Sequence, residues 1–262
     1  MINNIKFPGL GLEFEISRSL FSVFGIDVYT YGLIIGLGVI LGFIYAAREV
    51  EKQGISQDDF LNMFLIGVPA AIVCARLYYV IFSWDLYKNN LMDIFDIRGG
   101  GIAIYGGVIG AAVSVLIYCK KKKLNAKTVF DILAVGLLIG QAVGRWGNFV
   151  NGEAYGVECT LPWRMIVNGV SAHPAFLYES LWLLLGFIII WSTRKIKPFP
   201  GRSGCFYLIW YGVERAFVEL LRTDSLMLYG VRVSSVLSLV LVIIGVVGYF
   251  RLKKSYNSFI KL

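Results

Sequence analysis

The chain has 262 residues, of which 57% are hydrophobic and 16% charged, and its mean hydropathy is +0.70. Soluble domains contain about 45–50% apolar and about 25% charged residues. The composition therefore excludes an ordinary soluble domain and indicates a polytopic membrane protein. The formal net charge of +8 does not indicate a nucleic-acid partner, because the basic residues gather on one side of the predicted membrane spans. The four cysteines lack the spacings of metal sites and disulfide frameworks, and we expect them to be packing residues.

Residues 1–27 carry charged side chains among scattered apolar ones, and the segment LEFEIS alternates between apolar and polar residues. Such alternation is typical of a strand. We therefore predict a partly extended lead-in that lies at the outer membrane interface.

Seven apolar segments follow, and each is long enough for a transmembrane helix, which needs about 20 apolar residues. They are residues 28–47, 60–82, 99–119, 129–149, 175–193, 204–221 and 233–250. We therefore predict an all-α integral membrane protein with seven transmembrane helices. These helices form a single polytopic domain over residues 1–262, in which residues 150–174 are the longest outer connection.

Lysine and arginine are concentrated on the cytoplasmic side of membrane proteins. Fifteen of the 25 basic residues follow the first, third, fifth and seventh segments, and seven lie on the opposite side. The remaining three, Arg76, Arg145 and Arg215, lie within the segments or at their ends. This asymmetry predicts an N-terminus outside and a C-terminus in the cytoplasm. The run KKKKLNAK, residues 120–127, is expected to be a solvated loop that faces lipid headgroups.

The segment GRWGNFVNGEAYG, residues 144–156, places an arginine, two asparagines and a glutamate where the fourth span ends. A charge at the centre of a transmembrane helix costs roughly 2.5–3.5 kcal/mol on insertion scales, so such groups mark candidate functional sites. The charges toward the outer half of their spans are Arg145, Glu214, Arg215 and Glu219. In one interpretation the basic and amide groups bind an anionic headgroup at the outer leaflet. In the alternative, each arginine pairs with a glutamate, as Arg215 can with Glu219 four residues on, and holds helices together.

The third span begins with RGGGIAIYGGVIGA, residues 98–111, which contains six glycines. Glycines let helices approach closely in lipid, and they also permit irregular backbone whose N–H groups face a ligand. Both interpretations remain open at this point. By residue type alone, Tyr105 in this stretch is more typical of an interfacial anchor than of a catalytic group, and His173, just before the fifth span, is typical of a helix cap or a headgroup contact.

The segment GRWGNFVNGEAYG resembles the signature of the prolipoprotein diacylglyceryl transferase family, bacterial membrane enzymes that lipidate lipoprotein precursors. Five further blocks resemble those of the family and occur in its order: YGLIIGLG, ARLYYV, GGGIAIYGG, HPAFLYE and YGVERAFVELLR. The resemblance covers nearly the whole chain. It implies seven spans in the bacterial cytoplasmic membrane, with the N-terminus outside and the active site toward the outer leaflet.

The resemblance implies that the diacylglyceryl group of phosphatidylglycerol moves to the thiol of the lipobox cysteine in a prolipoprotein signal peptide. A thioether forms and glycerol phosphate leaves. The resemblance also implies surrounding membrane lipids and no metal, nucleotide or organic cofactor. Carried over by motif, the catalytic candidates are Arg145, Arg215, Glu153, Glu219 and Tyr105. The substrate-binding candidates are Asn148, Asn151, Gly156, Tyr31, Tyr211, Gly100, Gly106 and His173.

The chain departs from the family pattern at two positions. Tyr105 stands where many members have a histidine that is proposed as the base, and Phe176 stands where glutamine is often found. A tyrosine has a reference pKa of about 10 and is protonated near pH 7. We therefore expect Tyr105 to donate a hydrogen bond from a neutral hydroxyl, with the general-base role as the alternative.

These residue types fit the reaction. Expulsion of a phosphate ester develops negative charge, which Arg145 and Arg215 can stabilise. The incoming thiol has an unperturbed pKa of about 8.5, so nearby arginines would favour the thiolate. Glu153 or Glu219 can either orient an arginine or accept the proton.

Two other classes of membrane protein could carry similar charges. A transporter or anion channel is disfavoured, because the charged groups cluster on the outer side and the sequence lacks repeated halves. A non-catalytic lipid-binding scaffold is the second alternative.

Overall fold

The computed structural model describes residues 2–23, 26–96, 100–194, 196, 198–222, 227–228 and 231–260. The chain divides into two compact units. Unit 1 comprises Met1–Ala46 and Phe130–Leu262, and unit 2 comprises Ala47–Val129. The interpretation of the chain as one polytopic domain stays a prediction.

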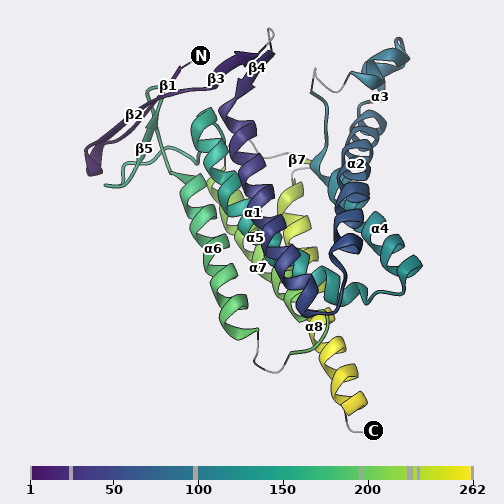
Figure 1. Cartoon of the computed structure of the whole chain (residues 1–262). Coiled ribbons are helices and arrows are strands. Elements are labelled where there is room, and N and C mark those ends of the chain that lie inside the picture. Colours follow the sequence, from purple (N-terminus) through teal and green to yellow (C-terminus); the bar gives the residue numbers. More distant parts are fainter. Residues whose placement is uncertain are drawn as a thin grey trace. The chain divides into compact units, whose positions relative to one another are not determined.

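Seven long helices account for most of the described residues (Figure 1). They are α1 (Thr30–Lys52), α2 (Gln57–Phe82), α4 (Ile104–Lys122), α5 (Ala126–Asn151), α6 (Ala175–Thr193), α7 (Arg202–Leu221) and α8 (Val233–Ile260). In the described part of the chain, six of them are long and apolar enough to cross a membrane, all except α7. The protein is therefore a helical, multi-pass membrane protein, as its composition predicts. Because Glu214, Arg215 and Glu219 interrupt the apolar sequence of α7, its crossing stays a prediction.

The third predicted span starts later than expected. Its predicted first residue, 99, lies outside the described residues, whereas α4 begins at Ile104. Gly100 and Gly101 have φ angles of +92° and +76°, a left-handed conformation that glycine adopts without steric cost. An irregular segment therefore leads into α4, as the second interpretation of the glycine-rich stretch requires, and the binding of a ligand by its N–H groups stays a prediction.

Unit 2 is built on the contact between α2 and α4, which are connected through the short helix α3 (Trp84–Tyr87) and the 3₁₀ turn η2 (Leu91–Phe95). A Cβ on Gly106 would lie 2.4 Å from the Cys74 carbonyl oxygen, and a Cβ on Gly110 would lie 2.6 Å from the Cys74 Cβ. These distances leave no room for a larger side chain, so the glycines allow the two helices to approach closely. The packing interpretation therefore holds for the second half of the stretch.

In unit 1, α1 and α5 cross where glycines of one helix face glycines of the other. A Cβ on Gly38 would lie 2.7 Å from the Gly140 carbonyl oxygen, and a Cβ on Gly42 would lie 2.6 Å from that of Gly136. Glycines spaced four residues apart on both helices give the close contact by which transmembrane helices associate in lipid. The crossing holds α5, the helix that carries most of the segment GRWGNFVNGEAYG, against α1.

A small β-sheet lies at one end of unit 1, while the C-terminal end of α8 lies at the other (Figure 1). The strand order is β2-β1-β5-β6, and all neighbouring strands are antiparallel. The strands are β1 (Ile2–Phe7), β2 (Leu12–Ser17), β5 (Met165–Val167) and β6 (Val170–Ala172). β1 and β2 confirm that the N-terminal segment is extended. β5 and β6 lie within the predicted outer connection, so the structure contains strands that the all-α prediction did not include. Two further antiparallel pairs lie among the described residues, β3 (Ser19–Val23) with β4 (Ile26–Tyr29) and β7 (Met227–Leu228) with β8 (Val231–Arg232).

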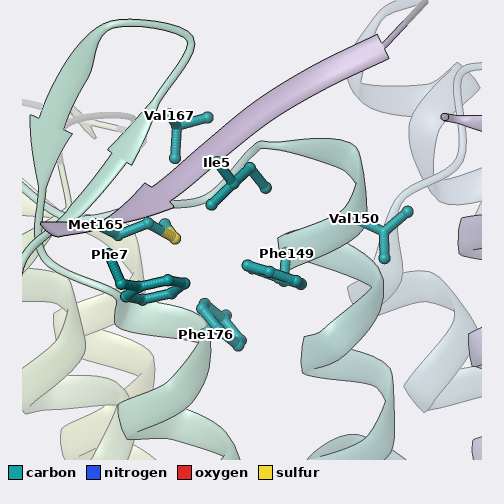
Figure 2. Close-up of a cluster of buried hydrophobic side chains, with 7 residues drawn as sticks. All are labelled: Ile5, Phe7, Phe149, Val150, Met165, Val167 and Phe176. Atoms are coloured by element: carbon teal, nitrogen blue, oxygen red, sulfur yellow. The ribbon is translucent and has the colours of Figure 1, made fainter. Parts of the chain in front are cut away.

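The sheet packs on the end of α5 and the start of α6 through a cluster of buried hydrophobic side chains. Figure 2 shows the Ile5 and Phe7 side chains of β1 directed toward Phe149 of α5 and Phe176 of α6. The rings of these two phenylalanines have centroids 4.7 Å apart. The buried members are Ile5, Phe7, Phe149, Val150, Met165, Val167 and Phe176. Phe176, one of the two departures from the family pattern, thus fills the hydrophobic junction that fixes the end of α5.

Contacts with α5 and α6 fix the position of α7. Asp131 of α5 accepts hydrogen bonds of 2.7 Å from the backbone N–H groups of Gly201 and Gly204, which satisfies donors at the N-terminus of α7. Trp182 of α6 and Trp210 of α7 each donate an indole N–H to the carbonyl of the other. Their rings stack with centroids 4.5 Å apart. These contacts set the rotation of α7 about its axis and hence the direction of its charged side chains.

Candidate active site

The segment GRWGNFVNGEAYG forms the last two turns of α5 and the turn that follows. Gly152 has a φ angle of +62° and donates its N–H to the Phe149 carbonyl at 3.0 Å, so the helix ends at a glycine as helices often do. The chain then folds back, and Glu153 Oε1 accepts hydrogen bonds of 3.2 Å from the side-chain amides of Asn148 and Asn151. The two asparagines and the glutamate thus form one polar cluster at the end of the helix.

Arg145 lies one turn before this cluster and pairs with a buried carboxylate of the next helix. Its Nη2 atom is 2.5 Å from Oε2 of Glu179 on α6. The arginine side chain is 20% exposed, whereas that of Glu179 is 2% exposed. Because a guanidinium has five N–H donors, Glu179 orients Arg145 and leaves it with donors for a second anionic group.

Arg215 is held in a similar way within α7. Its Nη2 atom is 2.8 Å from Oε2 of Glu219, which confirms the predicted pairing across one helical turn. Arg215 is 20% exposed and Glu219 fully buried. Arg215 also donates to the Ser234 hydroxyl on α8 at 3.4 Å, and Arg232 donates to the backbone carbonyl of Glu219. Contacts from α7 and α8 therefore fix this second guanidinium.

A third buried carboxylate, Glu214, lies on the same part of α7. Neither of its oxygens has a hydrogen-bond partner among the described residues. Electrostatic interactions link it to Glu179, Arg145 and Arg215, so the four side chains form one charged cluster. An unpaired carboxylate away from water is costly, and the two arginines offset part of that cost.

Tyr211 belongs to the same region of unit 1. It interacts electrostatically with Arg145 and Arg215, and its ring stacks on that of Tyr207 with centroids 5.8 Å apart. The Tyr207 hydroxyl accepts a hydrogen bond of 3.0 Å from the Gln141 amide. The structure therefore brings Tyr211, a predicted substrate-binding residue, together with both predicted arginines.

Gly156 and His173 are joined through the backbone. The Gly156 N–H donates to the His173 carbonyl at 3.0 Å, and a Cβ on Gly156 would lie 2.8 Å from the His173 Cβ. The His173 Nδ1 atom is 3.3 Å from the Tyr178 hydroxyl, which accepts a hydrogen bond of 2.8 Å from Trp163. An isolated β-bridge pairs Gly156 with Arg222 just after α7. The end of the segment is thus tied to both α6 and α7, and only glycine fits at residue 156.

Tyr31, in the first turn of α1, packs against the same segment. A Cβ on Gly147 would lie 2.8 Å from the Tyr31 ring, so the glycine makes room for the ring. Most of the predicted site residues therefore lie in unit 1. They are Tyr31, Arg145, Asn148, Asn151, Glu153, Gly156, His173, Tyr211, Arg215 and Glu219.

The other predicted residues, Gly100, Tyr105 and Gly106, belong to unit 2. Tyr105 is the second residue of α4 and is half-buried, with its ring 6.5 Å from that of Tyr78 in an edge-on arrangement. Gly100 lies in the irregular segment before α4, and Gly106 is buried against α2. Their part in substrate binding stays a prediction from the family resemblance.

Sequence reasoning left Glu179 and Glu214 out of the site, although both are visible as charges within predicted spans. Glu179 ends the block HPAFLYE, and Glu214 directly precedes Arg215. Sequence spacing predicts which side chains of the same helix are neighbours, but not which side chains of two different helices meet. It therefore could not pair Glu179 of α6 with Arg145 of α5. Both arginines form ion pairs with glutamates, as the alternative interpretation predicted. Because each guanidinium is partly exposed, these ion pairs still leave room for a second anion.

Two oriented guanidinium groups with spare donors can bind an anionic group and stabilise negative charge that develops on it, particularly where water is scarce. The neighbouring amides of Asn148 and Asn151 can add neutral hydrogen bonds. Within the described ranges, no three His, Cys, Asp or Glu side chains are grouped so as to hold a metal ion.

The chain is similar to known proteins over most of its length. A sequence model of the family described as prolipoprotein diacylglyceryl transferase matches residues 18–251. The chain is 46% identical over 240 residues to the phosphatidylglycerol–prolipoprotein diacylglyceryl transferase of Finegoldia magna, covering 91% of this chain and 97% of that protein. It is 44% identical over 239 residues to the protein of the same name from Clostridioides difficile, covering 91% and 96%. The identity to that of Bacillus mycoides is 44% over 250 residues, covering 91% and 93%.

Proposed function

The chain belongs to the prolipoprotein diacylglyceryl transferase family, and we propose that it transfers the diacylglyceryl group of phosphatidylglycerol to the lipobox cysteine of prolipoproteins. A thioether forms and glycerol phosphate leaves, which is the first step of bacterial lipoprotein maturation. One structural observation supports this beyond family membership. Two partly exposed arginines are each oriented by a buried glutamate, Arg145 by Glu179 and Arg215 by Glu219.

In the proposed reaction the cysteine sulfur bonds to the glyceryl carbon that carries the phosphate, and the bond from that carbon to the phosphate oxygen breaks. The electron pair of the broken bond stays on the phosphate ester, where Arg145 and Arg215 stabilise the added charge. Because each guanidinium is already held by its carboxylate, little reorganisation is needed when this charge develops. The same positive charge favours the thiolate form of the attacking cysteine.

The burial of the two candidate carboxylates separates their roles. Glu219 is fully buried and bound to Arg215, so it orients that arginine. Glu153 is exposed and holds the Asn148 and Asn151 amides, so it is the carboxylate of the two that a substrate can reach. We assign proton acceptance, or recognition of the glycerol headgroup through this amide cluster, to Glu153.

The proposed topology has seven crossings, with the N-terminus outside and the site toward the outer leaflet of the bacterial cytoplasmic membrane. The 20 residues of α7 extend about 30 Å at about 1.5 Å per residue, which matches the thickness of a bilayer core. The N-terminal sheet packs on the helix end that carries the polar cluster, and the C-terminal end of α8 lies at the opposite end of unit 1 (Figure 1). Together with the basic-residue asymmetry, this arrangement supports an outer site.

The experiment that tests the function uses the purified full-length protein with phosphatidylglycerol and a lipobox peptide. We expect the peptide to gain the mass of a diacylglyceryl thioether, and glycerol phosphate to appear in equal amount. Phosphatidylethanolamine should give no product, because its headgroup lacks the hydroxyls that the Asn148–Glu153 cluster would bind. A lipid-binding scaffold would bind both substrates and leave the peptide unmodified. A transporter or channel would instead move solute across a vesicle membrane.

A further inference from the structure

Arg76 of α2 is 6% exposed, and its guanidinium binds main-chain carbonyls. Its Nε, Nη1 and Nη2 atoms donate five hydrogen bonds with lengths from 2.6 to 2.9 Å. The accepting carbonyls are those of Asp93, Ile94, Asp96, Gly100 and Gly101. Because an arginine has five N–H donors, Arg76 has none left for a substrate.

In the part of the chain that the structure describes, Arg76 forms no ion pair with a carboxylate. Among the described residues, no carboxylate oxygen lies within ion-pair distance of its guanidinium. The ring of Tyr87 lies 5.1 Å from the guanidinium carbon, close enough for a cation–π interaction. A buried charge is costly unless it is hydrogen-bonded, so Arg76 and the residues whose carbonyls it binds, within 93–96 and 100–101, depend on each other for their conformation.

The same segment is anchored to α2 at a neighbouring point. The N–H of Ala103, the residue before α4, donates to the Ala75 carbonyl at 3.1 Å. Gly101 lies so close to α2 that a Cβ there would be 2.4 Å from Nη1 of Arg76. Tyr105 follows two residues after Ala103, in the first turn of α4. The conformation held by Arg76 therefore determines where α4 starts and how Tyr105 is presented.

We propose that Arg76 is a positioning residue for the transfer reaction, which holds Gly100 and Tyr105 in the arrangement that contacts substrate without touching substrate itself. This inference rests on the proposed function. Lysine cannot take over the role, because its compact ammonium has three donors and cannot span five carbonyls.

The test is a double-variant cycle in the purified full-length protein, with Arg76→Lys, Tyr105→Phe and the two combined. If Arg76 acts through Tyr105, Arg76→Lys should lower the initial rate of transfer by about tenfold or more, the scale of one lost hydrogen bond. It should lower the rate much less when residue 105 is already phenylalanine. Unchanged turnover in Arg76→Lys, or effects of the two changes that simply multiply, would overturn the inference.

The chain offers a matched control at the opposite end of the same helix pair. The Tyr118 hydroxyl donates to Asp59 Oδ1 at 2.8 Å, so Tyr118→Phe removes a contact between α4 and α2 away from the anchored segment, and we expect an unchanged rate. If Arg76→Lys does not fold, Gly101→Ala can replace it, because the added methyl group would collide with the Arg76 guanidinium. Gly101→Ala should then lower the rate much less when residue 105 is phenylalanine. Product formation by the unmodified chain in the same assay separates failure of this inference from failure of the proposed function.

Discussion

Arg145 and Glu179 face each other across the contact between α5 and α6, with Nη2 and Oε2 2.5 Å apart and the glutamate 2% exposed. Removal of one member of a buried ion pair leaves the other charge uncompensated, which costs about 3–5 kcal/mol. Lost activity in an Arg145 variant can therefore report lost stability or lost chemistry. Removal of both charges separates the two effects.

We expect Arg145→Ala to lower the thermal stability and to slow transfer by about a hundredfold or more, which corresponds to a transition-state contact of about 3 kcal/mol. In the double variant Arg145→Ala/Glu179→Gln, much of the stability should return because residue 179 no longer carries an uncompensated buried charge. Its activity should not return, because the phosphate has lost its guanidinium. The measurements are melting temperature and initial rate in the same detergent. A double variant with normal turnover would show that the pair is purely structural.

Arg215→Gln should likewise slow transfer by about a hundredfold. The glutamine amide can still donate to Glu219, so we expect the variant to fold and insert, but with a lower melting temperature because the buried Glu219 charge loses its counter-ion. Rate and melting temperature are measured with phosphatidylglycerol and the lipobox peptide.

The matched control for Arg215→Gln is Arg164→Gln. Arg164 is half-buried in the connection before β5 and donates only to carbonyls of its own loop among the described residues, at 3.5 Å. We expect this control to keep the full rate. Near-normal turnover in Arg215→Gln would assign that arginine to helix packing alone.

The topology can be tested by labelling single cysteines in intact cells, in a background in which the four native cysteines are serine. We expect Glu158→Cys to react with an impermeant thiol reagent from outside, because residue 158 is exposed and lies in the predicted outer connection. Lys122→Cys, at the end of α4 and 54% exposed, should react only after the membrane is made permeable. Labelling of Lys122→Cys from outside would reverse the proposed orientation.

The helices could be predicted from the sequence because a bilayer demands about 20 apolar residues for each crossing. Pairing within a helix could be predicted as well, since residues four apart share a face, and the Arg215–Glu219 contact confirms it. The start of α4 could not be predicted, because the glycines of residues 98–111 are compatible both with a tightly packed helix and with the left-handed conformation that Gly100 and Gly101 adopt.

Contacts between distant segments also lay beyond the sequence. The sheet pairs Ile5 of β1 with Val167 of β5, and no local pattern links residues so far apart. The Arg145–Glu179 pair joins two helices whose relative rotation depends on side-chain packing, such as the junction around Phe176. For the same reason Arg76 was visible as an intramembrane charge, while the five carbonyls that it binds were not.

The Tyr105 hydroxyl has no hydrogen-bond partner among the described residues, although its ring packs against that of Tyr78. A tyrosine hydroxyl is a ready donor at neutral pH, so we expect Tyr105 to donate to the substrate. Tyr105→Phe should then slow transfer by about ten- to a hundredfold, the scale of one lost hydrogen bond to a charged group of about 1.5–3 kcal/mol. Tyr105→His should remain active, because an imidazole can donate from the same place. The pH dependence of the rate distinguishes this role from general-base catalysis. If Tyr105 is a donor, the pH–rate profile of Tyr105→Phe should keep its shape at a lower rate. If residue 105 is the base, Tyr105→Phe should be inactive, and the profile of Tyr105→His should show the ionisation of residue 105 at a lower pH. The second outcome would contradict the donor role.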